Sequence, residues 1–338
     1  MKFDFAIGNP PYQDNAIGEN DTYAPPVYNK FLDAAYAVAD SVEMIHPARF
    51  LFNAGSTPKA WNEKMLNDPH FKVMEYETDA SKVFANTDIK GGIAISYRDK
   101  SKDFGAIEIF TKYPALNSIL TKVQKESKKT GYLESIISSP LNFQLTQKMK
   151  DEHPHLLDRL RTSAFTALAE IFYEINPNDG YDYVTMIGLL NGKRTKRYVR
   201  RDYIRENSKT LDKYVLLLPK ANGAGNFGEV LAPAEIAAKG EAYTQTFIGI
   251  GAFDSEYCAH NVEKYIKTKF ARAMLGVLKI TQDCPAPKWK FVPLQDFTDN
   301  SDINWNTSIA NIDKQLYKKY DLSHEEIDFI ETHVKEMV

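Results

Sequence analysis

Short apolar runs and amphipathic stretches alternate along the amino-terminal third of the chain. Residues 3–8 alternate bulky apolar side chains with Asp, Ala and Gly, which predicts a strand that Pro10 and Pro11 end. We predict further strands within 41–52 (centred on 42–45), over 71–77 and over 91–97, and helices over 27–39 and 61–66. Strands that alternate with helices predict an α/β fold with a parallel or mixed sheet, whose ligands bind at the carboxyl ends of the strands.

The pattern changes character after residue 112. We predict helices over 115–127, 140–149 and 156–160 and one long helix over 256–278, with strands over 183–189, 198–199, 214–218 and 246–250. Two short helices are predicted within 308–338, the second capped by Ser323 with acids in its first turn. We therefore expect an α/β subdomain at 1–112, a mixed α+β domain at 113–304 and a helical tail at 305–338.

The composition narrows the class of protein. A hydrophobic content of 43% and a charged content of 26% are ordinary for a globular protein. The sequence has no run of 18 apolar residues, so we predict no membrane span. Two cysteines, Cys258 and Cys284, fit a reducing compartment, and we expect a cytoplasmic protein. The histidines lack metal-ligand spacing, so we predict no metal site.

The charges are segregated, although the net charge is only −3. Residues 191–205 hold seven basic residues and one acid, and a second basic stretch covers 264–290. Segregated charge on a nearly neutral chain is typical of a protein with one face for a polyanion, although a solvated helix face would give the same count.

The corner after the first predicted strand holds a distinctive set of groups. The Asn9 side-chain oxygen and the Pro10 carbonyl can each accept one hydrogen from an amino group. Holding both hydrogens turns the nitrogen lone pair away from conjugation and makes it a usable nucleophile. Tyr12 can stack on the ring that carries the amino group. The pattern favours methylation of an amino nitrogen; the alternative is a Pro-Pro turn with Asn as an ordinary turn former.

Asn9-Pro10-Pro11-Tyr12 resembles the catalytic motif of amino methyltransferases that use S-adenosyl-L-methionine, which include adenine-N6 DNA enzymes and glutamine-N5 protein enzymes. Later segments resemble the target-recognition region of type IIG-like restriction–modification methylases: 191–195, 220–223, 265–272, 292–297 and 312–317. The resemblance covers essentially the whole chain. It implies a site-specific DNA adenine-N6 methyltransferase with a partial Rossmann-like sheet, which acts on double-stranded DNA and flips its target base.

The resemblance carries over to particular residues. It implies that Asn9, Pro10, Pro11 and Tyr12 are catalytic. Phe84 matches the second aromatic that packs on the flipped base, although a core phenylalanine would also fit its position. Arg49 is either a phosphate contact or an ordinary surface arginine. The residues that we expect to bind DNA are Lys193, Arg194, Lys196, Arg197, Arg200, Arg201, Lys267, Lys269 and Arg272.

The donor site of the family precedes the Asn-Pro-Pro-Tyr strand, whereas eight residues precede Asn9 here. We therefore expect that the isolated chain does not bind S-adenosyl-L-methionine and that strand 3–8 is an unpaired apolar edge. The donor-binding half would be lost or supplied by another chain. Residues 223–228 fit G-x-G-x-x-G, but Pro233 interrupts the helix that a dinucleotide site requires, and we expect a tight loop beside DNA phosphates.

Two alternatives to the DNA adenine-N6 methyltransferase remain open. The chain could be a non-catalytic DNA-binding remnant or specificity subunit, which keeps the recognition region without modifying DNA. It could also be a protein glutamine-N5 methyltransferase, against which the long basic second domain argues. The sequence shows no convincing nuclease motif.

Overall fold

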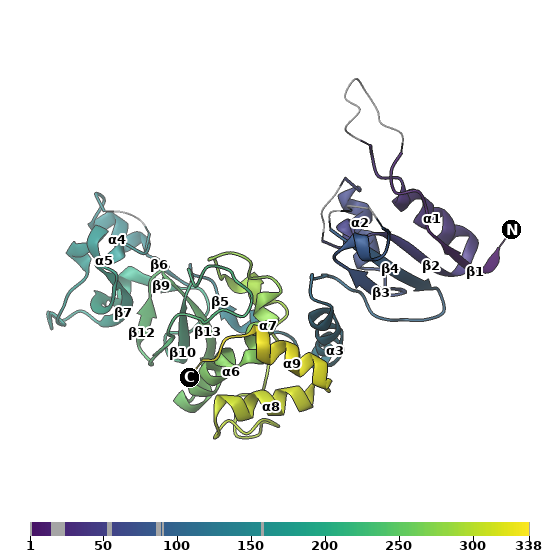
Figure 1. The fold of residues 1–338 in the computed structure, drawn as a ribbon. Helices are drawn as coiled ribbons and strands as arrows, with labels where there is room; N and C mark the ends of the chain where they lie inside the picture. Colours follow the sequence, from purple (N-terminus) through teal and green to yellow (C-terminus); the bar gives the residue numbers. More distant parts are fainter. Residues whose placement is uncertain are drawn as a thin grey trace. The chain divides into compact units, whose positions relative to one another are not determined.

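The computed structural model describes residues 2–14, 24–52, 56–85, 89, 91–156 and 159–337, and it falls into two compact units (Figure 1). Unit 1 is Met1–Thr121 and unit 2 is Lys122–Val338. The division lies within helix α3 (Pro114–Thr130), beyond the boundary at 112 that the sequence suggests. Each unit has a hydrophobic core of its own.

Unit 1 contains a mixed four-stranded sheet in the order β1-β2-β4-β3. β1 pairs with β2 in parallel, and β2 and β3 each pair with β4 in antiparallel register. β1, β2 and β3 therefore run in one direction, and their carboxyl ends meet at one edge of the sheet. The strands are β1 (Phe3–Gly8), β2 (Ala39–Pro47), β3 (Phe71–Glu77) and β4 (Ile93–Asp99).

One face of this sheet carries the core of unit 1. Helices α1 (Tyr28–Val38) and α2 (Lys59–Leu66) bury Leu32 and Met65 in one cluster with Phe71 and Ala94 of the sheet. The strand predicted within 41–52 is β2, which ends at Pro47. Residues Arg49–Phe52 form a 3-10 turn, η1, which turns Phe50 and Leu51 into this core.

β1 is an apolar edge strand, as predicted. Among the described strands it pairs with β2 alone. Ala6 packs with Ala35 and Val42 on the core side. Because side chains alternate along a strand, the other bulky residues of β1 point to the opposite face. There Phe3, Phe5 and Ile7 are 49%, 47% and 74% exposed.

His46 lies fully buried at the centre of unit 1. Its ring stacks on Tyr28 at 6.0 Å between centroids, and its nitrogens contact the Pro47 carbonyl at 3.1 Å and Ser96 Oγ at 2.8 Å. These partners fit a neutral ring that donates from Nδ1 and accepts from Ser96. Burial lowers the pKa of His46 to about 4.

We expect His46 to make folding sensitive to acid. Its pKa of about 4 in the folded chain lies below its ordinary value of 6.5, so the unfolded chain binds the extra proton more readily. The stability that it contributes is complete above pH 6.5 and falls by about 3 kcal/mol as the pH drops to about 4. Denaturant unfolding at about pH 7 and about pH 4.5 measures this slope. His46→Gln should flatten the slope and the exposed His324→Gln should not; equal slopes in all three proteins would contradict the account.

The described residues of unit 2 form three sheets, in the orders β11-β10-β13-β5, β12-β7-β8 and β6-β9. Its predicted strands are present, with extended bounds. The strands are β5 (Ile137–Ser138), β6 (Phe143–Leu145), β7 (Tyr183–Leu190), β8 (Lys193–Arg200), β9 (Ile204–Glu206), β10 (Tyr214–Pro219), β11 (Glu235–Ala237), β12 (Glu241–Tyr243) and β13 (Phe247–Phe253).

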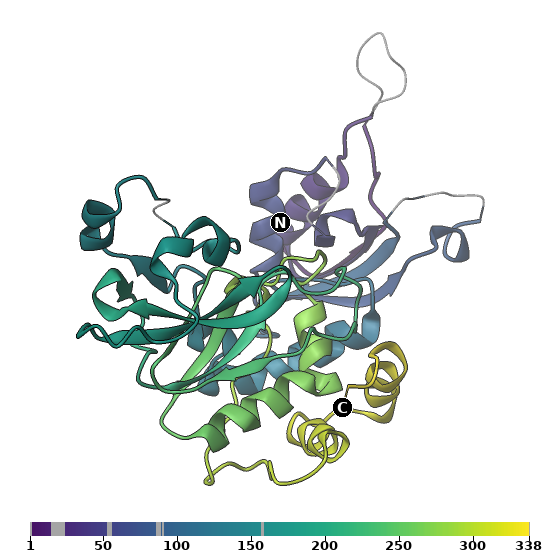
Figure 2. The ribbon, with the colours of Figure 1, turned by 90° about the vertical axis from the view of Figure 1, so that its left-hand side faces the viewer.

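β7 and β8 form a hairpin across the two-residue turn Asn191-Gly192, teal in Figure 2. Both turn residues have positive φ, 51° and 75°, as the tight turns that join twisted strands require.

The helices of unit 2 include a pair at its carboxyl end, α8 and α9, yellow in Figure 2. Ser323 and Glu326 form a capping box at the start of α9, so the predicted N-cap is confirmed. The helices that follow α3 are α4 (Gln147–Glu152), α5 (Ala164–Ala167), α6 (Glu256–Lys267), α7 (Lys269–Gly276), α8 (Ile309–Lys319) and α9 (His324–His333). Unit 2 also has the 3-10 turns η3 (Leu133–Ile136), η4 (Ala169–Ile171), η5 (Arg201–Tyr203) and η6 (Ala286–Trp289). Unit 1 has a further 3-10 turn, η2 (Ala80–Lys82).

Two helix predictions in unit 2 are wrong. Residues 140–149 contain strand β6, which pairs with β9, and α4 begins only after Thr146. The long helix over 256–278 is two helices, because Thr268 is extended at ψ 148° and its side chain caps α7. Asp313 also accepts the backbone N–H groups of Lys269 and Phe270 at 3.0 and 2.9 Å. The helix predicted over 156–160 lies partly outside the described residues.

Candidate functional site

The Asn9–Tyr12 corner follows the carboxyl end of β1, at the edge where β2 and β3 also end. Gly8 pairs with Met44 of β2 in parallel, so the corner lies beside the last residues of β2. The chain then folds back, because Val27 donates its N–H to the Tyr12 carbonyl at 3.1 Å. Asn9 is exposed and Pro10 is half-buried. Within the described part of the chain, no hydrogen bond engages the Asn9 side chain or the Pro10 carbonyl.

The structure brings Tyr12 and Phe84 together. Their ring centroids lie 6.4 Å apart at an angle of 63°, and both side chains are half-buried. The Tyr12 hydroxyl is buried without a hydrogen-bond partner among the described residues, and burial raises its pKa. A planar ring held between two aromatic faces needs about 7 Å between their planes, two contacts of about 3.5 Å each. The two rings must therefore turn parallel and separate slightly before a planar ring fits between them.

The loop that carries Phe84 is anchored after β3. The Asp79 side chain accepts the Ser81 N–H at 3.1 Å and caps η2, and the Glu77 side chain accepts the Asp79 N–H at 2.9 Å. Phe84 donates its own N–H to the Ala80 carbonyl at 2.9 Å. Phe84 thus stands on a hydrogen-bonded turn at the same edge of the sheet as Asn9. Residues 86–88, which follow this turn, lie outside the described residues.

Arg49 lies at the carboxyl end of β2, exposed at the start of η1. Its stem lies against Gly91, where an added Cβ would come within 2.7 Å of the Arg49 Cγ. Among the described residues, no hydrogen-bond or ion-pair partner engages its guanidinium. The described edge of the sheet therefore presents an amide, a carbonyl, two aromatic rings and an unpaired cation.

Most basic residues of β8 are neutralised by acids from neighbouring segments. Arg197 pairs with Glu174 at 2.7 Å and Arg194 with Glu235 at 3.6 Å, and Lys196 pairs with Glu241. Lys193, at the turn, is exposed and has no such partner in the described part of the chain. The sequence pattern does not reveal these pairs, because the acids come from other elements that lie beside β8 only in the folded chain.

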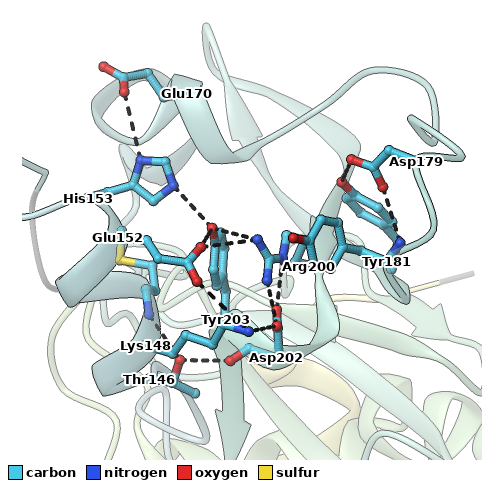
Figure 3. Close-up of polar contacts among 12 residues, drawn as sticks. Thr146, Lys148, Glu152, His153, Glu170, Asp179, Tyr181, Arg200, Asp202 and Tyr203 are labelled. Carbon is cyan, nitrogen blue, oxygen red and sulfur yellow. Dashed lines mark hydrogen bonds and ion pairs between the residues drawn. The ribbon is translucent and has the colours of Figure 1, made fainter.

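Arg200, which is buried, is the centre of a polar network whose acids Glu152 and Asp202 are exposed (Figure 3). Its guanidinium lies 3.6 Å from the ring centroid of Tyr181 and 4.3 Å from that of Tyr203. It pairs with Asp202 at 2.6 Å and with Glu152 at 3.1 Å, and the Tyr203 hydroxyl bonds to Glu152. This geometry fits a structural ion-pair network, and it does not fit the predicted contact of Arg200 with DNA. Arg201 is half-buried and donates to the Ile204 carbonyl at 2.7 Å.

The second basic stretch lines a cavity of about 820 Å³ in unit 2. Lys267 pairs there with Glu263 at 3.3 Å, and Lys269 pairs with Glu331. Arg272 is 2% exposed and donates to backbone carbonyls, among them that of Glu229 at 3.3 Å, and burial lowers its pKa to about 10. This burial does not fit the predicted contact of Arg272 with DNA; its side chain is part of the interior.

The backbone N–H groups of the glycine-rich loop 223–228 are bound by the carboxylate of Glu229, the residue that follows the loop. Glu229 accepts the N–H groups of Ala224 at 2.8 Å and Gly225 at 2.9 Å, and it pairs with Lys279. The pKa of Glu229 is lowered overall. Burial alone would raise it, but the charge of Lys279 and the hydrogen bonds from these N–H groups together lower it by more. A Cβ at Gly225 would lie 2.4 Å from the backbone of Thr281. The glycines serve close packing, so the predicted phosphate contact through these amides does not fit.

Sequence comparison finds that the amino-terminal part of the chain is similar to restriction-modification methylases. Residues 1–84 match the Eco57I restriction-modification methylase family. A stretch of 95 residues, 28% of this chain, is 32% identical to an "Uncharacterized adenine-specific methylase" of Mycoplasma pneumoniae (strain ATCC 29342 / M129 / Subtype 1). The matched stretch is 22% of the length of that relative.

Structural comparison gives weaker matches. The type IIL restriction-modification enzyme MmeI in complex with DNA is 10% identical, with a TM-score of 0.34 over 97% of this chain and 56% of that one. The type IIG restriction endonuclease BpuSI is 10% identical, with a TM-score of 0.29 over 95% of this chain and 50% of that one. Similarity at this level is too weak to define a shared fold.

The described residues contain neither a candidate membrane-spanning helix nor a candidate metal-binding cluster. No helix there is long and apolar enough to cross a membrane. No group of three or more His, Cys, Asp or Glu side chains there could hold a metal ion.

Proposed function

We propose that the chain is the base-holding and DNA-binding part of a site-specific DNA adenine-N6 methyltransferase of a restriction–modification system. The observation that carries this proposal is the corner after β1. Its Asn9 and Pro10 acceptors are not engaged by the described chain, and Tyr12 lies 6.4 Å from Phe84. An exocyclic amino group donates two hydrogens, and the corner offers two acceptors beside two aromatic rings.

The reaction assigns a separate task to each group. Asn9 and Pro10 accept the two amino hydrogens, which leaves the nitrogen lone pair free to attack a methyl group. Tyr12 and Phe84 hold the faces of the base. A base inside a duplex cannot reach such a corner, so the target adenine must leave the helix first. Pro11 is the rigid residue that fixes the carbonyl of Pro10 relative to Tyr12.

The described residues of this chain do not fit the methyl donor, S-adenosyl-L-methionine. The one G-x-G-x-x-G segment, 223–228, has its amides taken by Glu229. We infer that a donor-binding part, on the same polypeptide or on a separate chain, completes a Rossmann-like sheet beside β1. A strand of that part would pair with the edge of β1 that the described strands leave unpaired, and the part would also cover Phe3, Phe5 and Ile7, which are exposed on the adjoining face of the sheet.

Capture of an extruded base tests the aromatic pair. Tyr12→Ala should weaken the flipped state, because stacking on an aromatic side chain is worth about 1–3 kcal/mol per base. A fluorescent adenine analogue at the target position, in DNA bound by the complete enzyme, reports the flipped population. Phe31→Ala, which removes another exposed ring of unit 1, is the control and should leave the signal unchanged. Undiminished fluorescence in Tyr12→Ala would show that the ring does not hold the base.

A further inference from the structure

Unit 2 has a shallow depression of about 550 Å³ between the segment 161–166 and the turn of the β7–β8 hairpin. Arg161, Thr162, Ser163 and Thr166 line one side, and Asn191 and Gly192 line the other. None of the described residues that line it is acidic. The depression is open to solvent, because Arg161, Thr162, Ser163 and Thr166 are all exposed.

The donors around this depression are free within the described chain. Among the described residues, no hydrogen bond or ion pair engages the guanidinium of Arg161 or the hydroxyls of Thr162, Ser163 and Thr166. The amine of Lys193, which follows Gly192 at the turn, is likewise unpaired there. A guanidinium, an amine and three hydroxyls are the side-chain donors that contact the phosphates of nucleic acids.

The rest of the basic surface differs in charge. Lys196 and Arg197, farther along β8, are paired with Glu241 and Glu174. The larger cavity near α6 is lined by basic residues and by an equal number of acids: Lys264, Lys267, Lys269 and Arg272 against Glu263, Asp313, Glu331 and Glu336. The hairpin turn is therefore the end of β8 at which basic charge stays uncompensated within the described chain.

The segment 161–166 is fixed firmly on the hairpin. Leu160 and Ala164 are buried, and the Phe165 ring packs on β7 where Gly188 leaves it room. An added Cβ at Gly188 would lie 2.8 Å from that ring. Gln245 also donates its N–H to the Leu160 carbonyl at 2.9 Å. The donors on both sides of the depression thus have a fixed relative position.

We propose that this depression seats phosphates of the DNA backbone, with Arg161 and Lys193 as the charged contacts and the hydroxyls of Ser163 and Thr166 as neutral ones. The proposal rests on the proposed function, since it names where unit 2 contacts the duplex. Backbone contacts of this kind fix the register of a protein on DNA and carry no sequence information directly.

The salt dependence of DNA binding tests the proposed phosphate-binding site. The full chain is titrated with a fluorescently labelled linear duplex at several KCl concentrations, and the slope of log affinity against log salt is compared. Arg161→Gln with Lys193→Gln should lower the magnitude of this slope by about 0.9 for each phosphate that the variant no longer neutralises. Ser163→Ala with Thr166→Ala should keep the slope and weaken binding about 2- to 10-fold for each hydrogen bond to a phosphate that is removed.

The matched control removes the same charge from paired lysines. Lys213 and Lys220 pair with Asp254 and Asp283, so Lys213→Gln with Lys220→Gln should keep the wild-type slope. If the wild-type chain binds the duplex and the double variant Arg161→Gln with Lys193→Gln has the wild-type slope, the depression is not a phosphate-binding site. The proposed function then still stands. If the wild-type chain does not bind the duplex at all, both the DNA-binding part of the proposed function and the proposed phosphate-binding site are wrong.

Discussion

Glu229→Ala should destabilise unit 2 by about 3–5 kcal/mol, because it leaves the buried Lys279 amine without its counter-charge. The side chain of Lys279 is 3% exposed, and the carboxylate also accepts the N–H groups of residues 224–226. Removing the carboxylate leaves these N–H groups without their acceptor and leaves the Lys279 amine with only the Thr281 carbonyl, 3.3 Å away. A decrease of this size is a large fraction of the unfolding free energy of an ordinary protein, about 5–15 kcal/mol.

Denaturant unfolding at neutral pH measures this change in stability. Glu229→Gln keeps an acceptor oxygen for the loop but removes the charge, so it should lie between Glu229→Ala and wild type. Asp212→Ala is the control: Asp212 is exposed, has no hydrogen-bond or ion-pair partner in the described chain, and should change stability by less than about 0.5 kcal/mol. A decrease below about 1 kcal/mol in Glu229→Ala would mean that the glycine loop does not depend on the carboxylate.

The sequence predicted the elements of unit 1 well, because their signals are local. Phe71–Glu77 has the predicted bounds, and β1 ends at Gly8 before two prolines, as its alternating pattern indicates. The edge position of β1 was also predicted. The end of β2 at Pro47 was not, because it depends on the burial of Phe50 and Leu51 beneath α2.

Unit 2 was predicted less well, because distant residues decide its local structure. The break between α6 and α7 depends on Thr268 and on Asp313, whose carboxylate reaches the start of α7 from α8. β6 is a strand of three residues, and it is stabilised by pairing with β9, which no local pattern shows.

The candidate functional residues likewise include some that local sequence predicts and some that it does not. The Asn-Pro-Pro-Tyr corner was predicted from chemistry and resemblance, and the structure shows that Phe84 reaches Tyr12. The charged surface could not be predicted, since counting basic residues along β8 does not show which of them meet an acid. Arg197 and Glu174 lie far apart in sequence and 2.7 Å apart in space. The burial of Arg200 and Arg272 likewise depends on contacts made only in the folded chain.

Asn9→Ala should abolish methyl transfer in the enzyme completed by its donor-binding part, a decrease of at least about 100-fold if Asn9 holds the amino group in the transition state. DNA affinity should change little, because Asn9 meets the amino group only after the base has left the helix. Transfer of a radioactive methyl group to duplex DNA measures the rate, and binding to a labelled duplex at fixed salt measures the affinity. Asn67→Ala, at the end of α2 and away from β1, is the control. Full activity in Asn9→Ala would make the corner a structural turn.

The most direct test of the central claim is the identity of the methylated product. DNA incubated with the chain, its donor-binding part and S-adenosyl-L-methionine is digested to nucleosides and analysed by mass spectrometry. We predict N6-methyladenine, formed at one recurring sequence and abolished by Asn9→Ala. Methylated glutamine in a protein, or DNA that is bound but never methylated, would contradict the assignment of this chain to an adenine-N6 DNA methyltransferase.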